Sequence, residues 1–409
     1  MKKNIFCALL LSLGVSQVAQ AQELKLLLKQ SLVKSPELLK ARSDLEASKN
    51  RIEQAKSMHY PTVNLKANQF ATEWHRDKDD NAEHKFEPSV EVGLNLYSFG
   101  AIEAEVDKNR AEKDYYQQQY IATKDDLAYQ IGNLYIDALS AKEQIAVLKK
   151  SLKRHDSFIR EIRTIVEHDK GRRSELVQAQ ARKILVEQKI NEQQRVLQTS
   201  LNKLVKYTHR RLTVADLQTP FKGVTKAKLK KYYSVKNYNQ HPTYLASQAE
   251  LRSKDYEYIA AKKKNLPSID LVSNIGRDDR TVSVQFNWGL YNRQNNYNIR
   301  EKANIKAAAS QDLDILVLNL KEMANQALID MTLTQRELNI LGRQSKANIK
   351  VADFYRLQFN VGRKSLFEVL TAENDLSDVR LGFVNAKSSF NHAVLDYLHS
   401  QGTLLKWMK

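Results

Sequence analysis

The stretch that decides the fold is SVEVGLNLYSFGAIEAEV, residues 89–106. Apolar and polar residues alternate in its first half, which predicts a β-strand with one apolar and one polar face. Gly100 ends this strand, and the following residues 101–170 contain no proline and a single glycine, Gly132. The stretch therefore predicts a strand that leads directly into one very long helix, of about 105 Å.

The same arrangement occurs twice in the chain. Pro36 and Pro61 bracket a polar helix, and Pro242 and Pro267 bracket another at the same offset of 206 residues. In each copy two alternating segments, a long helix, a glycine and a return helix then come in that order, and the second long helix is predicted over residues 293–361. A period of about 200 residues is too long for a solenoid, so we infer a duplicated domain half.

The chain is predicted to have four parts. Residues 1–21 begin with lysines, continue with an apolar run and end in Ala-Gln-Ala, which is the pattern of a secretory signal peptide cleaved after Ala21. The remainder consists of a first structural repeat, a basic linker that joins the halves and a second structural repeat: residues 22–216, 217–241 and 242–409.

Four segments with period-two alternation supply the predicted strands. Their apolar residues fall on one face: Val63, Leu65, Ala67, Val90, Val92, Leu94, Leu96, Ile269, Leu271, Ile275, Val282, Val284, Phe286 and Trp288. Such segments are typical of a membrane β-barrel with a wet lumen, although a soluble hairpin packed on one face has the same pattern. Residues 75–84 suit an outward loop, and their histidines and acids have no recognisable metal-ligand spacing.

The long helices have the pattern of a coiled coil. Apolar residues recur every seven positions in the first of them, from Ile131 to Val166. The short helix and the return helix of each half together nearly match the long helix, so we expect one continuous helix to pack against two shorter ones. Four strands cannot close a membrane barrel, and an open sheet edge is not viable in lipid. The chain must therefore oligomerise, and geometry alone leaves a dimer and a trimer open.

These features together resemble the TolC-type outer-membrane efflux and secretion channels. The resemblance covers nearly all of residues 22–409 and rests on Pro-x-Leu-x-x-Ala openings at Pro36 and, more loosely, Pro242, on LPSIDL from Leu266, on LNLYSFG from Leu94, and on the Val361-Gly362 turn followed by FEVLTA. It implies a mainly α fold with a small β part, and a homotrimer in the bacterial outer membrane, embedded in its lipid and extending into the periplasm. Each chain would add four strands to a transmembrane β-barrel and helices to a long α-helical coiled-coil barrel.

The tunnel is expected to end where each long helix reverses, at Gly171 and Gly362. Glycine suits both positions because the residue after a helix often takes a positive φ. The exposed turns are expected to meet the hairpin tip of a periplasmic adaptor through Gly171, Arg172, Arg173, Gly362, Arg363 and Ser365.

By resemblance, the gate of the tunnel is assigned to four residues around the second turn: Phe359, Lys364, Glu368 and Thr371. The aromatic and the acidic side chain help to close the tunnel. A second acidic position of the family pattern is the threonine here, so three copies of the glutamate form a single acidic ring. The lysine matches a basic position that ties neighbouring hairpins together, with Asp169 or Glu175 as its partner on the first hairpin.

The predicted function is a passive exit duct of a tripartite export system. The sequence has no glycine-rich phosphate loop, so energy is expected from an inner-membrane ABC or proton-driven transporter that is joined through the adaptor, and no cofactor is expected. The single cysteine, Cys7, lies too early to become the lipid anchor that many drug-efflux members carry. This difference favours type I protein secretion over multidrug efflux.

Three other classes of function are weaker. A structural coiled-coil protein of the envelope would share the helices but have no lumen. A nucleic-acid binder is suggested by the net charge of +18, and export argues against it. An enzyme is disfavoured because 12 glycines and 6 prolines are few for a compact enzyme of this length, and no HExxH or GxSxG motif is present.

Overall fold

The structure is a computed structural model that describes residues 22–69, 86–235, 238–276 and 280–409. The predicted signal peptide, the charged segment 75–84 and the second hairpin turn at 277–279 lie outside the described residues. The chain divides into two compact units, and each unit combines segments of both predicted repeats. Unit 1 comprises residues 1–39, 123–241 and 318–409, and unit 2 comprises residues 40–122 and 242–317.

Two helices of 68 residues contribute to both units, namely α3 (Ala101–His168) and α7 (Arg293–Asn360). The prediction of one uninterrupted helix after each pair of strands is confirmed, and each helix ends one or two residues earlier than expected. Within the described part of the chain, no helix is long and apolar enough to cross a membrane.

Two short helices lead to the strands, α2 (Pro36–Lys56) and α6 (Pro242–Lys263). Each begins with a proline, which suits the first helical position because the N–H that proline lacks has no partner there. The end of α2 tightens into the 3₁₀ turn η2 (Ser57–His59). Ala55 of α2 packs with Ile102 and Val106 of α3 in a small buried cluster of unit 2.

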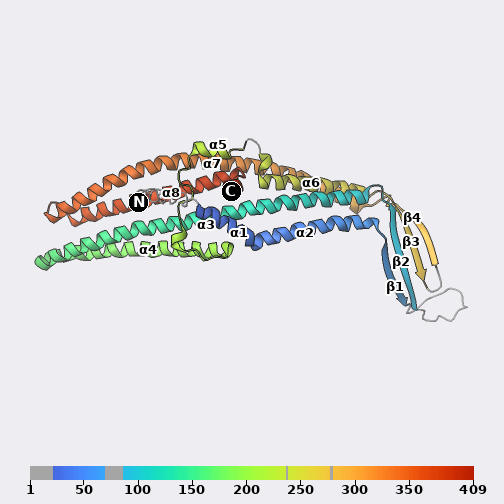
Figure 1. The fold of residues 1–409 in the computed structure, drawn as a ribbon, viewed down its shortest axis with the longest axis horizontal. Helices are drawn as coiled ribbons and strands as arrows, with labels where there is room; N and C mark the ends of the chain where they lie inside the picture. The colour runs from blue at the N-terminus through green and yellow to red at the C-terminus, as the bar shows by residue number, and fades with distance from the viewer. Residues whose placement is uncertain (1–21, 70–85, 236–237, 277–279) are drawn as a thin grey trace, which may run out of the picture. The chain divides into compact units, whose positions relative to one another are not determined.

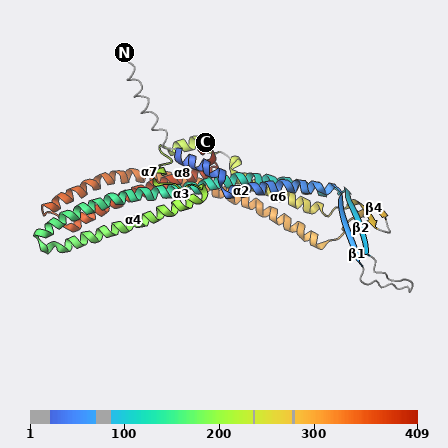
Figure 2. The ribbon, with the colours of Figure 1, turned by 60° about the horizontal axis from the view of Figure 1, so that its bottom comes forward.

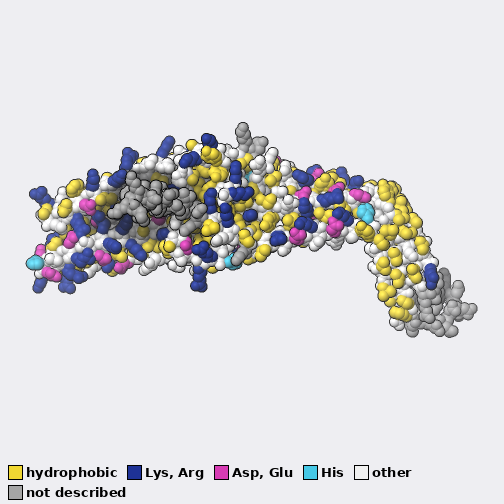
Figure 3. All heavy atoms as spheres, in the orientation of Figure 1, with side chains coloured by type: hydrophobic (Ala, Val, Ile, Leu, Met, Phe, Trp, Pro, Cys, Tyr) yellow, Lys and Arg dark blue, Asp and Glu magenta, His cyan; other side chains and the backbone are white. Residues whose placement is uncertain are grey.

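The strands form one antiparallel sheet in the order β1-β2-β3-β4. Their bounds are Thr62–Gln69, Phe86–Tyr97, Ser268–Gly276 and Arg280–Asn287. The register brings the predicted apolar residues into rows across the sheet: Val63 pairs with Val92, Leu94 pairs with Leu271, and Leu271 with Val284. The predicted two-faced sheet is confirmed, and hydrophobic side chains dominate the strands where Figure 3 shows them.

The opposite face of the sheet has a hydrogen-bonded polar row. Asn95 Nδ2 donates to Asp270 Oδ1 at 2.7 Å, and Asn287 Nδ2 donates to Asp270 Oδ2 at 3.2 Å. Lys66 Nζ lies 2.6 Å from Glu91 Oε2 on the same face. In contrast, Val63 is 68% exposed although it lies on the apolar face, so none of the described residues covers it.

Unit 1 contains two helical hairpins that lie side by side in Figures 1 and 2. The first joins α3 to α4 (Arg173–Thr208) and the second joins α7 to α8 (Leu366–Ser400). Gly132 of α3 lies against Leu395 of α8, and a Cβ at this glycine would come within 2.8 Å of the leucine side chain. Glycine at this position therefore permits a close approach of the two hairpins.

Three shorter helices complete unit 1: α1 (Gln22–Lys34), α5 (Lys226–Tyr233) and α9 (Leu404–Met408). Neither α1 nor α9 was predicted from the sequence. Leu24 and Leu28 of α1 are buried, and α1 contacts α4 and α9. Tertiary packing thus fixes these helices, which are too short for a strong periodic signal.

Candidate functional site at the hairpin turns

The first hairpin turns without a left-handed residue. The Asp169 side chain accepts the Gly171 N–H at 3.0 Å, and a 3₁₀ turn, η3 (Lys170–Arg172), leads into α4. The described glycines with positive φ are Gly100, Gly223, Gly362 and Gly402, so the positive φ predicted for Gly171 is wrong. The aspartate side chain caps the turn, and this removes the need for a left-handed glycine.

The second hairpin turns as predicted. Gly362 has a φ of +72°. Its N–H donates to Phe359 O at 3.0 Å, and the Arg363 N–H donates to Gln358 O at 2.8 Å. These two bonds define a Schellman motif, in which glycine is the favoured left-handed residue.

A capping box begins α8 directly after that turn. The Ser365 hydroxyl accepts the Glu368 N–H, and Glu368 Oε2 accepts the Ser365 N–H at 3.0 Å. The sequence signal for it is Ser-x-x-Glu before an apolar run, which the sequence analysis did not use. Glu368 is therefore fixed at the start of α8 and cannot turn freely.

Lys364 pairs with Glu368 of its own turn. Its Nζ lies 2.5 Å from Glu368 Oε1 and 4.4 Å from the centre of the Tyr355 ring. The bond from Lys364, followed by those from Ser365, lowers the pKa of Glu368 to about 2. The predicted partners of this lysine, Asp169 and Glu175, form other contacts within the first hairpin. Asp169 accepts the Gly171 N–H, and Glu175 pairs with Arg172 at 2.7 Å.

Phe359 does not face outward. It is 1% exposed and lies in a core cluster between the two hairpins, with its ring centre 5.2 Å from that of Phe158 and 5.0 Å from the Arg172 guanidinium. In the single chain the ring is used in helix packing, so the part of Phe359 in closing the tunnel stays a prediction. The exposed aromatic residue at the turn is Phe367, which is 67% exposed.

The other predicted residues lie on the surface of the two turns. Arg173, Arg363 and Ser365 are exposed, and Arg172 is half-buried by its ion pair and its contact with the Phe359 ring. Thr371 is exposed one helical turn after Phe367, and its hydroxyl donates to Phe367 O at 2.8 Å. The structure thus brings together Lys364, Ser365 and Glu368, whereas Arg173 and Thr371 stand apart from this group.

Arginines connect the two hairpins above the turns, which the sequence analysis missed. Arg154 of α3 binds Glu373 of α8 and reaches Asp353 of α7 at 3.0 Å. Arg356 of α7 contacts Glu161 of α3 in the same way. The bond to Glu161 raises the pKa of Arg356. Burial lowers the pKa of Arg154, but the ion pairs with Glu373 and Asp353 outweigh this effect and the pKa is raised.

An apolar stripe on α7 has no cover within the described chain. Leu333, Ile340 and Phe354 of α7 and Val361, the residue directly after it, are spaced by multiples of seven, and each is more than half exposed. A heptad stripe of this kind is what a second helix packs against in a coiled coil. This face of the second hairpin is therefore suited to contact with another copy of the chain.

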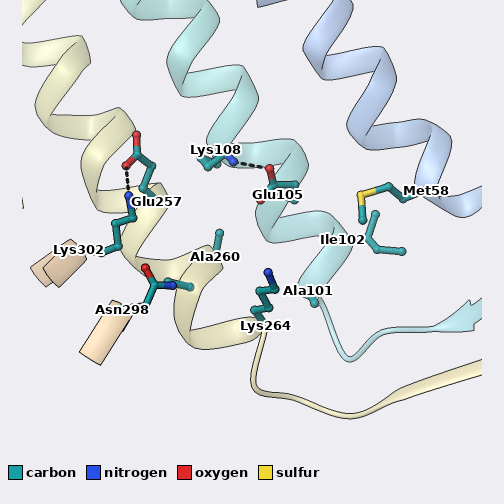
Figure 4. Close-up of a pocket in the computed structure, with 11 residues that line it drawn as sticks. Met58, Ala101, Ile102, Glu105, Lys108, Glu257, Ala260, Lys264, Asn298 and Lys302 are labelled. Carbon is teal, nitrogen blue, oxygen red and sulfur yellow. Dashed lines mark hydrogen bonds and ion pairs between the residues drawn. The ribbon is translucent and has the colours of Figure 1, made fainter. Parts of the chain in front are cut away.

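Two ion pairs lie around a cavity of about 470 Å³ in unit 2 (Figure 4). Lys302 Nζ lies 3.4 Å from Glu257 Oε2, and Lys108 pairs with Glu105. Among the residues that the structure describes, no cluster of histidine, aspartate or glutamate side chains is arranged to hold a metal ion.

The family model for outer membrane efflux proteins matches residues 27–208 and 236–396. Among solved structures, the chain is similar to CusC, with a TM-score of 0.78 and 16% identity over 94% of this chain and 92% of that one. It is also similar to the Campylobacter jejuni CmeC outer membrane channel, with a TM-score of 0.77 and 15% identity over 93% and 86%. A third similar structure is the open state of the Neisseria gonorrhoeae MtrE outer membrane channel, with a TM-score of 0.75 and 15% identity over 93% of this chain and 89% of that one. At these identities the likeness is one of fold. A search of curated proteins finds no match.

Proposed function

We propose, from the premise that this chain belongs to the outer membrane efflux protein family, that it is the passive exit duct of a tripartite export system. Its fold is that of the family's channels, which lie in the outer membrane and extend into the periplasm. The observation that carries the proposal is the combination of a four-stranded sheet with an uncovered apolar face and two helical hairpins in one chain. Neither the sheet nor the pair of hairpins closes into a barrel in a single copy of the chain.

Three copies of the chain would complete both parts. Among the residues that the structure describes, no strand pairs with the outer edges of β1 and β4, and strand edges in lipid must be paired. Pairing β4 of one copy with β1 of the next would close twelve strands into a barrel. The apolar stripe of Leu333, Ile340, Phe354 and Val361 would then pack on a neighbouring hairpin in the helical part.

The hairpin turns would form the gate and the adaptor contact. Arg173, Arg363 and Ser365 are exposed there and can meet the hairpin tip of an adaptor. Three copies of Glu368 would form an acidic ring, with Phe367 as the exposed aromatic residue beside it. The pair of Arg154 with Glu373 would hold the second hairpin against the first, so opening would require this pair to break.

The cargo has two candidates. The first is protein, as in type I secretion. The second is small molecules, and membership of the outer membrane efflux protein family favours it. In either case an inner-membrane transporter would supply the energy.

The test is single-channel recording of the purified protein in a planar bilayer. Lys364→Glu should raise the resting conductance because it replaces attraction to Glu368 by repulsion, and Glu368→Ala should weaken block by multivalent cations. Lys189→Gln is the control, since this exposed lysine lies on α4, away from the turn. No conductance from the wild-type protein would reject the channel. Unchanged conductance and block in both variants would place the gate elsewhere in the tunnel.

A further inference from the structure

The basic linker has no role in the duct proposed above. Residues 217–241 contain no aspartate or glutamate. The described lysines of this segment, which we call the linker lysines, are Lys222, Lys226, Lys228, Lys230 and Lys231. Four of them lie on α5, and Lys and Arg side chains project from the surface around that helix in Figure 3. Like charges kept so close together without acids point to an external anion.

The linker is fixed in place, so the positions of its lysines are defined. Leu217, Phe221 and Leu229 are each no more than 3% exposed, and the Phe221 ring centre lies 5.0 Å from that of Trp407 in α9. Lys142 of α3 donates to Leu217 O at 2.7 Å. Apolar anchors therefore hold one side of the linker, while the linker lysines are exposed on the other. Two of them also donate within the chain, Lys226 to Thr332 Oγ1 at 2.8 Å and Lys228 to Gly223 O at 3.2 Å.

A cavity of about 440 Å³ lies at the start of this segment, between the linker, α3 and α8. Its walls include Lys142, Lys222 and Lys387, with Glu143 as the acid among them. Glu143 is already paired with Lys387 at 2.6 Å, so the cavity keeps a positive excess. Its volume is in the range of about 300–1,000 Å³ that is usual for small-ligand sites.

One wall of the cavity also has an unsatisfied acceptor. Gln218 is one of the residues that line the cavity, and its Oε1 is buried with no hydrogen-bond donor among the described residues. Leaving a buried acceptor unpaired costs about 1–3 kcal/mol. An occupant with an N–H group would satisfy this oxygen once the amide turns toward the cavity. An inorganic anion or a lone carboxylate could not.

We propose that this cavity binds the carboxyl end of a short peptide, and that the linker lysines bind further acidic groups of the same polymer. Lysine ammonium groups form charge-assisted hydrogen bonds with a carboxylate, and the peptide N–H supplies the donor for Gln218. In the periplasm, the polymer that presents many short peptides with free carboxylates is the cell wall. The linker thus anchors the channel to peptidoglycan, a role separate from conduction.

The test is co-sedimentation of the purified full-length protein, in detergent, with isolated peptidoglycan sacculi. The variant Lys222→Gln/Lys230→Gln/Lys231→Gln should weaken binding at least about tenfold, because each lysine near an anionic surface contributes to affinity. The matched control removes the same charge from exposed positions of α3: Lys149→Gln/Lys150→Gln/Lys153→Gln. It should bind within about twofold of the wild type.

A second variant separates the cavity from charge alone. Gln218→Met keeps the size and the net charge but removes the acceptor, so weaker binding by this variant, with unchanged helical content, supports the site. Wild-type binding should also fall on sacculi whose carboxylates have been amidated. Equal losses in both triple variants would overturn the proposal. It would also be overturned by unchanged binding to amidated sacculi, or by binding to polyglutamate or phosphatidylglycerol vesicles that is as tight as to sacculi.

Discussion

Arg154 of α3 and Glu373 of α8 form a bidentate ion pair, with Nε 2.7 Å from Oε2 and Nη2 2.8 Å from Oε1. The glutamate side chain is only 7% exposed, so its carboxylate contacts this arginine instead of solvent. The residues belong to different hairpins of unit 1. The pair therefore fixes how α8 is seated on α3, with a directional contact that apolar packing alone does not supply.

Arg154→Gln is expected to destabilise the protein by at least about 2 kcal/mol. Breaking a fully buried pair costs about 3–5 kcal/mol because a buried charge remains, and Arg154 is 22% exposed, which lowers that figure. The loss of stability is measured by following the helical signal during thermal unfolding. Arg154→Gln, Glu373→Gln and the double variant together form a double-mutant cycle with the wild type. Lys189 and Asp378 form the control pair, which joins α4 to α8 at 3.6 Å with both side chains more than half exposed. A coupling energy no larger than that of the control would contradict the role of the Arg154 pair.

Periodicity made most of the fold predictable. The alternation in residues 89–97 and the proline-free run after Gly100 indicate the strand and the long helix before any contact is known. The offset of 206 residues between the paired prolines indicates the duplication. These signals are local or repeated, so a single sequence contains them in full.

The side-chain arrangement at the turns was less predictable. Arg154 and Glu373 are 219 residues apart, and no sequence period links them. The resemblance assigns Phe359 to the gate, but only the packing of the two hairpins decides that its ring points inward in the single chain. The capping box from Ser365 to Glu368 could have been found, since its spacing is a local signal.

Gly362→Ala is expected to be costly and Gly171→Ala is expected to be tolerated. Gly362 has a φ of +72° with nothing within 4 Å of an added Cβ, so its penalty is backbone strain, of about 1–2 kcal/mol. Gly171 lies outside the left-handed region, and the nearest atom to an added Cβ is Asp169 Oδ1 at 3.1 Å. Thermal unfolding and export assays of the two variants provide the measurement.

A bulkier residue at Gly362 should also abolish export while oligomers still form, because the strain is confined to the turn. Equal effects of the alanine variants at positions 171 and 362 would show that the left-handed turn has no special importance.

Val92→Arg is expected to destabilise the protein far more than Gln285→Arg. Val92 lies on the apolar face of the sheet, opposite Val63, and an arginine there would cost about 2–4 kcal/mol at mid-depth in a bilayer. Gln285 lies on the polar face, opposite Asp270, which can accept from the new guanidinium. The stabilities of the two variants are compared by thermal unfolding in lipid vesicles. If both variants lost the same stability, the assignment of the two faces would be wrong.

Glu368 is expected to keep its charge to a lower pH than an ordinary glutamate. The bond from Lys364, then those from Ser365, hold its pKa at about 2, against about 4.3 for an unperturbed glutamate. Because the folded-state pKa is depressed, the stability from the ionised carboxylate is complete above the ordinary pKa. It is lost as the pH falls toward about 2.

The measurement is the difference in unfolding temperature between the wild type and Glu368→Gln as a function of pH. This difference should be constant above about pH 5 and shrink between about pH 4 and 2. Lys364→Met removes the first donor to the carboxylate, so in that background the loss should move to higher pH. A difference that did not vary with pH would mean that the ionised carboxylate does not stabilise this turn. Loss at the same pH with and without Lys364 would mean that the lysine does not set the pKa of Glu368.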